Sequence, residues 1–181
     1  MQSVRSRARR VFTRVTARRF VPGSKARRPL SADPLGGRRE SHLKIDLAES
    51  DDAILACCPV MQSLRELDDA SSFLRRVRSQ QGSGYRLAAL SDGAGPIAVA
   101  GFRLSESLAW GHHLYVDDLA TLPEARSKGY GAALLSWLAE FARSKGAHQL
   151  HLDSGTQRED AHRFYRREGL EVSSLHFNRT L

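Results

Sequence analysis

One stretch of the sequence, residues 119–137, constrains the fold more than any other. It reads LATLPEARSKGYGAALLSW and passes from an apolar strand through a short basic turn into an amphipathic helix. Gly146 then follows, in the place typical of a residue just beyond a helix C-terminus. Apolar residues recur at the spacing of one buried helical face: Tyr130, Ala133, Leu134, Trp137, Leu138 and Phe141.

The turn has the composition of a phosphate-binding site. Gly129 and Gly131 let a ligand approach the backbone because they carry no Cβ. The first N–H groups of a helix have no intrahelical acceptor, and the helix dipole adds partial positive charge there. Full charges come from two basic side chains. We therefore predict a phosphate or pyrophosphate site formed by Arg126, Ser127, Lys128, Gly129, Tyr130, Gly131 and Ala132.

The spacing of the glycines excludes two common nucleotide-binding motifs. No Gly-Lys-Ser/Thr follows the spacer that a P-loop requires, and Leu134 occupies the third glycine position of a dinucleotide-binding fingerprint. An ordinary tight turn is one alternative. The order of strand, proline-containing turn, R-x-x-G-x-G and amphipathic helix resembles motif A of the GCN5-related N-acetyltransferases (GNAT). That resemblance implies that the turn wraps the pyrophosphate of acetyl-CoA.

Charge is divided unevenly along the 181 residues, whose net charge is +8. Residues 1–39 contain eleven Arg, one Lys and a single acid, Asp33, whereas the remainder has 16 basic and 19 acidic residues. We predict a disordered Arg-rich extension at 1–40 and one folded domain at 41–181. The extension has three interpretations: an arm that touches nucleic acid or anionic surfaces, an organelle leader, or a dispensable segment.

The two cysteines, Cys57 and Cys58, are adjacent and have no other cysteine to pair with. This usage indicates a reduced, cytoplasmic chain. The two thiols are interpreted as small buried residues of a helix, with a nucleophile as the alternative. No apolar run approaches the roughly 20 residues of a membrane span, so no membrane partner is expected. The sequence does not indicate an oligomeric state.

The remaining pattern predicts alternating strands and helices. A strand at 42–47 precedes a helix that Ser50 or Asp51 caps and that restarts at Pro59. Asp68 or Asp69 caps a second helix. The pattern also predicts strands at 85–90, 96–104, 110–121 and 149–153. A helix is predicted at 159–168, and two closing strands are predicted at 170–172 and 175–181.

The long strand at 110–121 changes its alternation partway along. Leu114 and Val116 share one parity, whereas Leu119 and Thr121 share the other. The slip falls at Asp117-Asp118 and predicts a β-bulge there, which turns the end of the strand away from its neighbour.

The GNAT resemblance covers about residues 42–181 and implies an α/β fold. Its mixed, mostly antiparallel sheet of about six or seven strands is flanked by about four helices. In that fold the strand carrying Leu119, Ala120 and Thr121 splays from the strand at 149–153, and pantetheine lies in the gap. The segment 160–170 resembles the family's A-x-x-x-Y-x-x-x-G-F pattern through Ala161, Tyr165 and Gly169. Leu170 replaces the usual Phe, and Arg158 stands where the family often has Asn.

Acid–base candidates follow from this placement. Tyr165 is the candidate general acid for a leaving thiolate, and the alternative is that its ring only packs beneath the cofactor. Asp117 or Asp118 is the candidate base for the amine, directly or through water, and the pair favours a cationic acceptor. His112 and His113 are further candidates on the same strand. His148 and His151 lie on opposite strand faces, so no metal site is expected.

These features together predict an N-acetyltransferase that transfers the acetyl group of acetyl-CoA to a primary amine on a small molecule or protein. Transfer is expected to be direct, within a ternary complex. The alternative is a protein without catalysis that binds CoA, or that binds nucleic acid through the basic N-terminal arm alone.

Because the extension has charge opposite to that of the remainder, we predict that removing residues 1–40 leaves a folded protein that still binds acetyl-CoA. Thermal melting and calorimetric titration measure both properties. A large fall in melting temperature would instead make the extension part of the fold.

Overall fold

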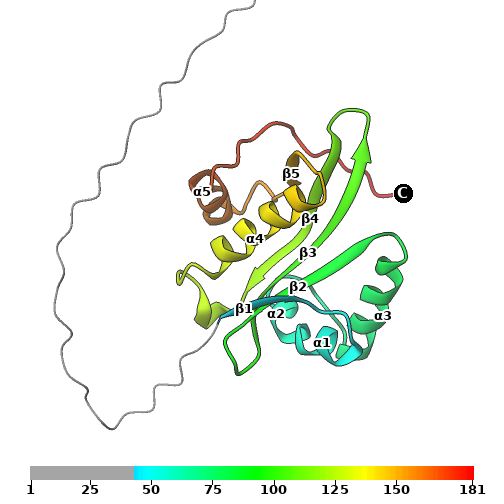
Figure 1. Cartoon of the computed structure of the whole chain (residues 1–181), viewed down its shortest axis with the longest axis vertical. Coiled ribbons are helices and arrows are strands. Elements are labelled where there is room, and N and C mark those ends of the chain that lie inside the picture. Colours follow the sequence, from blue (N-terminus) through cyan, green and yellow to red (C-terminus); the bar gives the residue numbers. More distant parts are fainter. Residues whose placement is uncertain (1–42) are drawn as a thin grey trace, which may run out of the picture. The chain divides into compact units, whose positions relative to one another are not determined.

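A five-stranded sheet forms the centre of the computed structural model, which describes residues 43–181 (Figure 1). The extension predicted at 1–40 lies outside the described residues. The sheet order follows the chain: β1 Lys44–Leu47, β2 Tyr85–Ser91, β3 Pro96–Ser107, β4 Gly111–Thr121 and β5 Gln149–Leu152. Neighbouring strands are antiparallel except β4 and β5, which are parallel.

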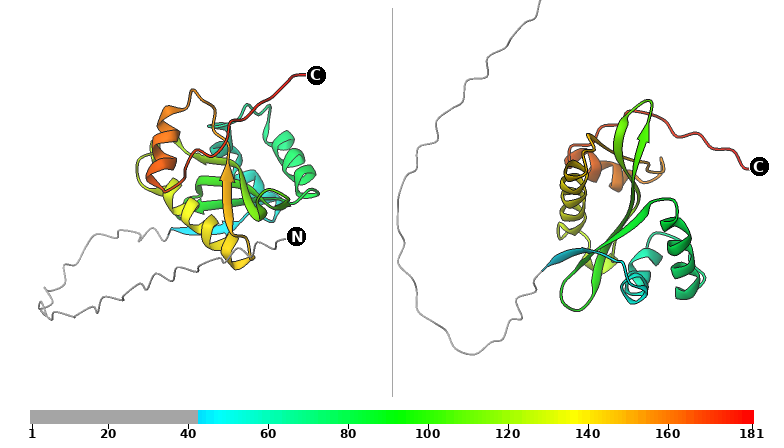
Figure 2. Two further views of the ribbon diagram at one scale, coloured as in Figure 1. Left: turned by 90° about the horizontal axis from the view of Figure 1, so that it is seen from above. Right: turned by 45° about the vertical axis from the view of Figure 1, so that its right-hand side comes forward.

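Helices cover both faces of the sheet (Figures 1 and 2). The first face carries α1 Asp51–Ala56, α2 Cys58–Gln62 and α3 Ala70–Gln81. The second carries α4 Tyr130–Ser144 and α5 Glu159–Arg167. A short 3-10 helix, η1 Pro123–Ala125, precedes α4. None of the helices in residues 43–181 is long and apolar enough to cross a membrane.

Local sequence signals account for the helix boundaries. The Ser50 hydroxyl accepts from the Ala53 N–H at 3.2 Å, and the Asp69 carboxylate accepts from the Ser72 N–H at 2.7 Å. Both are N-caps, as predicted. Pro59 lies in the first turn of α2, where its missing N–H costs nothing, so the predicted restart divides one helix into two.

Each face of the sheet has its own hydrophobic core. Under α1–α3 the core includes Ile54, Val60, Phe73 and Leu87. Under α4 it includes Phe102, Leu114, Leu134 and Leu138. Because strand side chains alternate between faces, one sheet supplies both cores.

Both cysteines lie in the first core, and both side chains are buried, as predicted. Burial, followed by the neighbouring Cys58, raises the pKa of the Cys57 thiol to about 12. The Cys57 thiol therefore stays protonated at neutral pH, and a nucleophilic role is not supported.

The C-terminal segment departs from expectation. Residues 170–172 and 175–181 were predicted as closing strands, but neither pairs with the sheet, so the described residues contain five strands rather than six or seven. The apolar side chains of this segment do not reach either core: Val172, Leu175 and Phe177 are 73%, 73% and 85% exposed. Local alternation alone does not form a strand where no neighbouring strand edge pairs with it. The mixed, mostly antiparallel α/β fold is nevertheless confirmed.

Candidate active site

A β-bulge in β4 creates the opening in which the candidate site lies. Gly101 of β3 pairs with Asp118, and the next residue, Phe102, pairs with Val116, so Asp117 is the extra residue. The ladder between β4 and β5 covers only His113–Val116 and ends where the bulge begins. The predicted bulge is confirmed, and β4 leaves β5 there.

Beyond the bulge, one edge of β4 has no strand partner. Ala98, Val99 and Ala100 of β3 pair with Thr121, Ala120 and Leu119 along the other edge. The edge that faces away from β3 therefore keeps backbone N–H and C=O groups available to a ligand. Ala120 is buried in the first core, whereas Leu119 and Thr121 are partly exposed. The three residues that the sequence assigned to cofactor binding thus form this open edge.

A cavity of about 820 Å³ lies at the same place. One wall comes from α2, α3 and the segment between them. The opposite wall comes from the end of β5, the following segment and Tyr165 of α5. The bulge residues Asp117 and Asp118 lie between the two walls. Residues 105–113 do not line this cavity.

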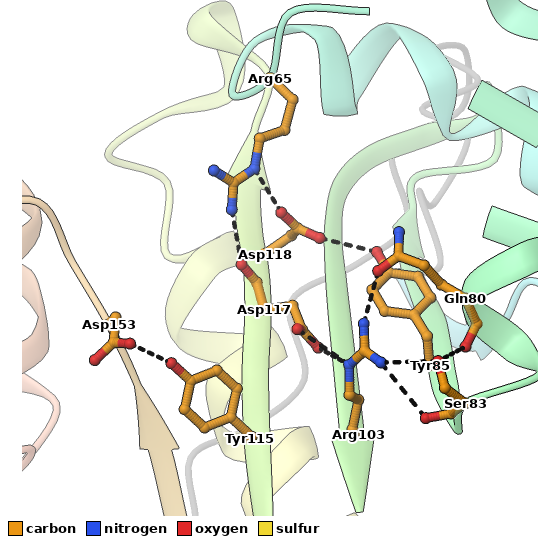
Figure 3. Close-up of polar contacts among 9 residues, drawn as sticks. All are labelled: Arg65, Gln80, Ser83, Tyr85, Arg103, Tyr115, Asp117, Asp118 and Asp153. Atoms are coloured by element: carbon orange, nitrogen blue, oxygen red, sulfur yellow. Dashed lines mark hydrogen bonds and ion pairs between the residues drawn. The ribbon is translucent and has the colours of Figure 1, made fainter. Parts of the chain in front are cut away.

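Asp118 is held by two partners from distant parts of the chain (Figure 3). Arg65 Nε donates to Asp118 Oδ1 at 2.8 Å, and the Tyr85 hydroxyl donates to Asp118 Oδ2 at 2.9 Å. Arg65 Nη2 also donates to the backbone oxygen of Asp117 at 3.0 Å. Arg65 therefore stabilises both the charge of the carboxylate and a carbonyl that the bulge releases from the ladder.

Asp117 is paired with Arg103. Arg103 Nε lies 3.1 Å from each oxygen of the Asp117 carboxylate, and Arg103 Nη2 donates to Gln80 Oε1 at 2.6 Å. Burial raises the pKa of Asp117, and the charge of Arg103 opposes that rise. The expected attraction of Asp117 and Asp118 for a cationic acceptor is therefore weakened, because each carboxylate already has an arginine partner.

The hydrogen bond from the Tyr85 hydroxyl to Asp118 depends on Gly101. Tyr85 lies on β2 and Asp118 on β4, so the tyrosine ring crosses β3 between them, over Gly101. A Cβ built on Gly101 would lie 2.0 Å from the Tyr85 hydroxyl oxygen and 2.5 Å from its Cζ. Only a residue without a side chain permits this crossing.

Tyr165 lies on α5 and lines the cavity opposite α3, so the structure brings this candidate acid and both bulge carboxylates to one cavity. Burial raises the pKa of the Tyr165 hydroxyl, and the nearby charge of Arg158 opposes the rise. A phenol with a raised pKa keeps its proton at neutral pH, which a proton donor requires.

The predicted phosphate turn has the required backbone. Gly129 is left-handed, with φ +85°, and precedes α4; Ser127 also has a positive φ, 61°. The Ala133 N–H donates to the Gly129 oxygen at 2.9 Å, which leaves the N–H groups of residues 130–132 without intrahelical acceptors. Arg126 and Lys128 are exposed and form no ion pair within residues 43–181. Free N–H groups and uncommitted cations fit a pyrophosphate.

Gly131 faces the gap between β4 and α5. A Cβ built there would lie 3.4 Å from Phe164 Cζ and 3.8 Å from Thr121 Oγ1. One added carbon is therefore tolerated by the protein itself, but it occupies space beside the open edge of β4.

The histidine candidates lie elsewhere. His113 is buried, its Nδ1 lies 2.9 Å from the Gly111 oxygen, and its ring packs edge-on against Trp110. Neither His112 nor His113 lines the cavity. The sequence analysis did not identify Arg65, Tyr85 and Arg103 as site residues. Only Gly101 offered a sequence signal for this arrangement, because a glycine inside a strand often marks a place where another group packs closely against the backbone.

Comparisons with known proteins agree on one family. A family model described as the acetyltransferase (GNAT) family matches residues 41–170. An uncharacterized N-acetyltransferase, YhdJ of Bacillus subtilis, is 37% identical over 123 residues, covering 67% of this chain and 87% of that protein. The aminoalkylphosphonate N-acetyltransferase of Salmonella typhimurium is 41% identical over 66 residues, covering 36% of this chain and 43% of that protein.

Among solved structures, the aminoglycoside N-acetyltransferase AAC(6')-Iy in complex with CoA has a TM-score of 0.67 at 14% identity. The match covers 79% of this chain and 97% of that one. At this identity the likeness shows the shared fold.

Because Gly131 lies beside the open edge of β4, a larger residue there should impair ligand binding selectively. We expect Gly131→Val to fold normally and to lose acetyl-CoA binding, because the branched side chain fills the space beside the turn. Calorimetric titration measures the affinity. Ala133→Val is the matched control and should bind normally, because Ala133 is exposed in the structure, whereas the sequence pattern predicted it on the buried face. Equal affinity of the Gly131 variant and wild type would remove this turn as the phosphate site.

The passage of the Tyr85 ring over Gly101 leads to a prediction about stability. Gly101→Ala must displace the buried Tyr85 ring and break its hydrogen bond to Asp118, at a cost of about 1–3 kcal/mol in the free energy of unfolding. Urea unfolding measures this cost. Tyr85→Phe removes the same hydrogen bond without overpacking and should cost less. If the two variants unfold alike, Gly101 does not act through the space that the ring needs.

Proposed function

The chain belongs to the acetyltransferase (GNAT) family and is an acyltransferase, and from this premise we propose that it transfers the acetyl group of acetyl-CoA to a primary amine in a ternary complex. Within this proposal, residues 41–181 form the transferase domain and residues 1–40 an extension to it.

The observation that carries the proposal is the open edge of β4, residues 119–121. It runs from the bulge carboxylates to the turn that precedes α4. An extended, amide-containing chain such as pantetheine can pair with such an edge through its own amides. The pyrophosphate would then meet the free N–H groups of residues 130–132 together with Arg126 and Lys128. The thioester end would lie in the cavity that Tyr165 and the bulge residues share.

The names of two relatives support an amine as the acceptor. One relative acetylates aminoalkylphosphonates, and another, from Streptomyces lavendulae, is a streptothricin acetyltransferase. The chain matches only 43% and 41% of these two proteins, and their names differ in acceptor while agreeing on acetyl transfer. We therefore propose N-acetylation as the reaction and a small amine as the preferred acceptor.

Direct transfer requires two proton movements. The amine loses a proton as its nitrogen attacks the thioester carbonyl carbon, and the thiolate gains one as the C–S bond breaks. We assign the first proton to Asp117 or Asp118, directly or through water. Burial raises the pKa of Asp117 and makes that carboxylate a stronger base. Asp118 retains acceptor capacity beside Arg65 and Tyr85, because a carboxylate offers about four acceptor sites.

The second proton is assigned to the Tyr165 hydroxyl. Arg158 stands where the family often has Asn and lies close enough to Tyr165 to oppose the rise of its pKa. The positive charge of Arg158 would also stabilise the thiolate as it forms. In this arrangement Tyr165 contributes to the transition state and little to the binding of either substrate.

The role of Tyr165 predicts a specific kinetic change. Tyr165→Phe keeps the ring and removes the hydroxyl, so we expect kcat to fall by about ten- to a thousand-fold while acetyl-CoA affinity stays nearly unchanged. Because burial raises the pKa of Tyr165, the wild-type rate should fall only above the ordinary pKa of about 10, and the variant should lack that fall. CoA release at saturating amine measures the rate. A kcat within about threefold of wild type would leave Tyr165 as a packing residue only.

A further inference from the structure

The cavity wall formed by α3 carries a positive charge that has no ion-pair partner among residues 43–181. Phe73, Arg76, Val77 and Gln80 line the cavity from this helix, and their spacing places them on one helical face. Arg76 is exposed toward solvent and the cavity, between two side chains that belong to the first core. Its neighbour Arg75 is also exposed but does not line the cavity.

The other charges of the cavity are largely compensated. Arg65 pairs with Asp118, and Arg103 pairs with Asp117. Asp153, at the far wall, accepts from the Tyr115 hydroxyl and lies 3.1 Å from His176 Nδ1. Two lining arginines remain, Arg76 and Arg158, that form no ion pair within the part of the chain that the structure describes. Arg158 lies beside Tyr165, at the transfer end, so Arg76 is the cation of the opposite wall.

Arg76 lies on the same wall as a group that helps to hold the bulge. Gln80 is one helical turn further along α3, about 6 Å away along the helix axis. Gln80 contacts Arg103, and Arg103 holds Asp117 at the bulge. An acceptor whose amine reaches the bulge carboxylates therefore has Arg76 on an adjoining wall of the same cavity. A guanidinium in a concave site attracts an oxyanion and binds it through two N–H groups.

We propose that Arg76 binds an anionic group of the acceptor, so that the substrate class is a small primary amine that also carries a carboxylate or a phosphonate. This inference rests on the proposed N-acetyl transfer, because only that reaction defines an acceptor. It reverses the preference for a purely cationic acceptor that the Asp117-Asp118 pair suggests from sequence.

The test compares amines of matched length. CoA release is measured with β-alanine, 2-aminoethylphosphonate, n-propylamine and 1,3-diaminopropane. We expect kcat/KM for the better of the two anionic amines to exceed that for n-propylamine by about tenfold, the size of one charge-assisted interaction. β-Alanine and 2-aminoethylphosphonate together distinguish a carboxylate site from a phosphonate site. A higher kcat/KM for n-propylamine or 1,3-diaminopropane would overturn the proposal.

Variants of α3 then test whether Arg76 causes the preference for anionic amines. Arg76→Gln should raise KM for the preferred anionic amine about tenfold with little change in kcat, and should leave n-propylamine within about twofold. Arg75→Gln is the matched control and should change neither amine. Equal losses for charged and uncharged amines in the Arg76 variant would contradict a role in binding the anion. Thermal melting of both variants checks that each is folded.

Failure of the proposed function gives a different result. If no amine in a wider panel releases CoA, N-acetyl transfer fails as the proposed reaction. Calorimetric titration with 2-aminoethylphosphonate and β-alanine then tests the anion site alone. Binding by wild type that Arg76→Gln abolishes would support the site, whereas no binding, or equal binding by both proteins, would overturn it.

Discussion

One additional residue in β4 opens the sheet at the candidate site. Because Asp117 has no partner in β3, the parallel ladder to β5 stops after Val116, and the last residues of β4 keep an open edge. The same irregularity directs two carboxylates toward the cavity and frees a carbonyl that Arg65 must satisfy. Removal of the extra residue would extend the ladder and close the opening, so ligand binding and regular pairing exclude each other at this position.

Electrostatic compensation explains how two adjacent carboxylates are tolerated there. Adjacent like charges destabilise one another, and partial burial increases that cost. Arg65 comes from the segment after α2 and Arg103 from β3, so each charge is balanced by a different part of the fold. Tyr85 adds a neutral donor that fixes the orientation of Asp118 without adding charge. The arrangement leaves the cavity walls, rather than the bulge, to determine which charge an acceptor needs.

Local patterns predicted most of the fold, whereas the contacts of the site depend on distant residues. The parity change between Val116 and Leu119 located the bulge, and Ser50 and Pro59 marked helix boundaries, because each signal acts within a few residues. The partnership of Arg65 with Asp118 joins residues 53 positions apart and leaves no local pattern. The closing strands failed for a related reason: strand pairing requires a partner edge elsewhere in the fold, which the local alternation of Leu175 and Phe177 does not reveal.

The two cores under the opposite faces of the sheet have no residue in common. Substitutions in one core are separated from the other by the backbone layer of the sheet, and well-separated substitutions contribute almost additively to stability. The helices of the first core can therefore change sequence without loosening α4 and the turn before it. Under the proposed function, a laboratory library restricted to α2 and α3 would vary the acceptor and keep the phosphate turn, provided that the packing around Ala120 of the open edge is preserved.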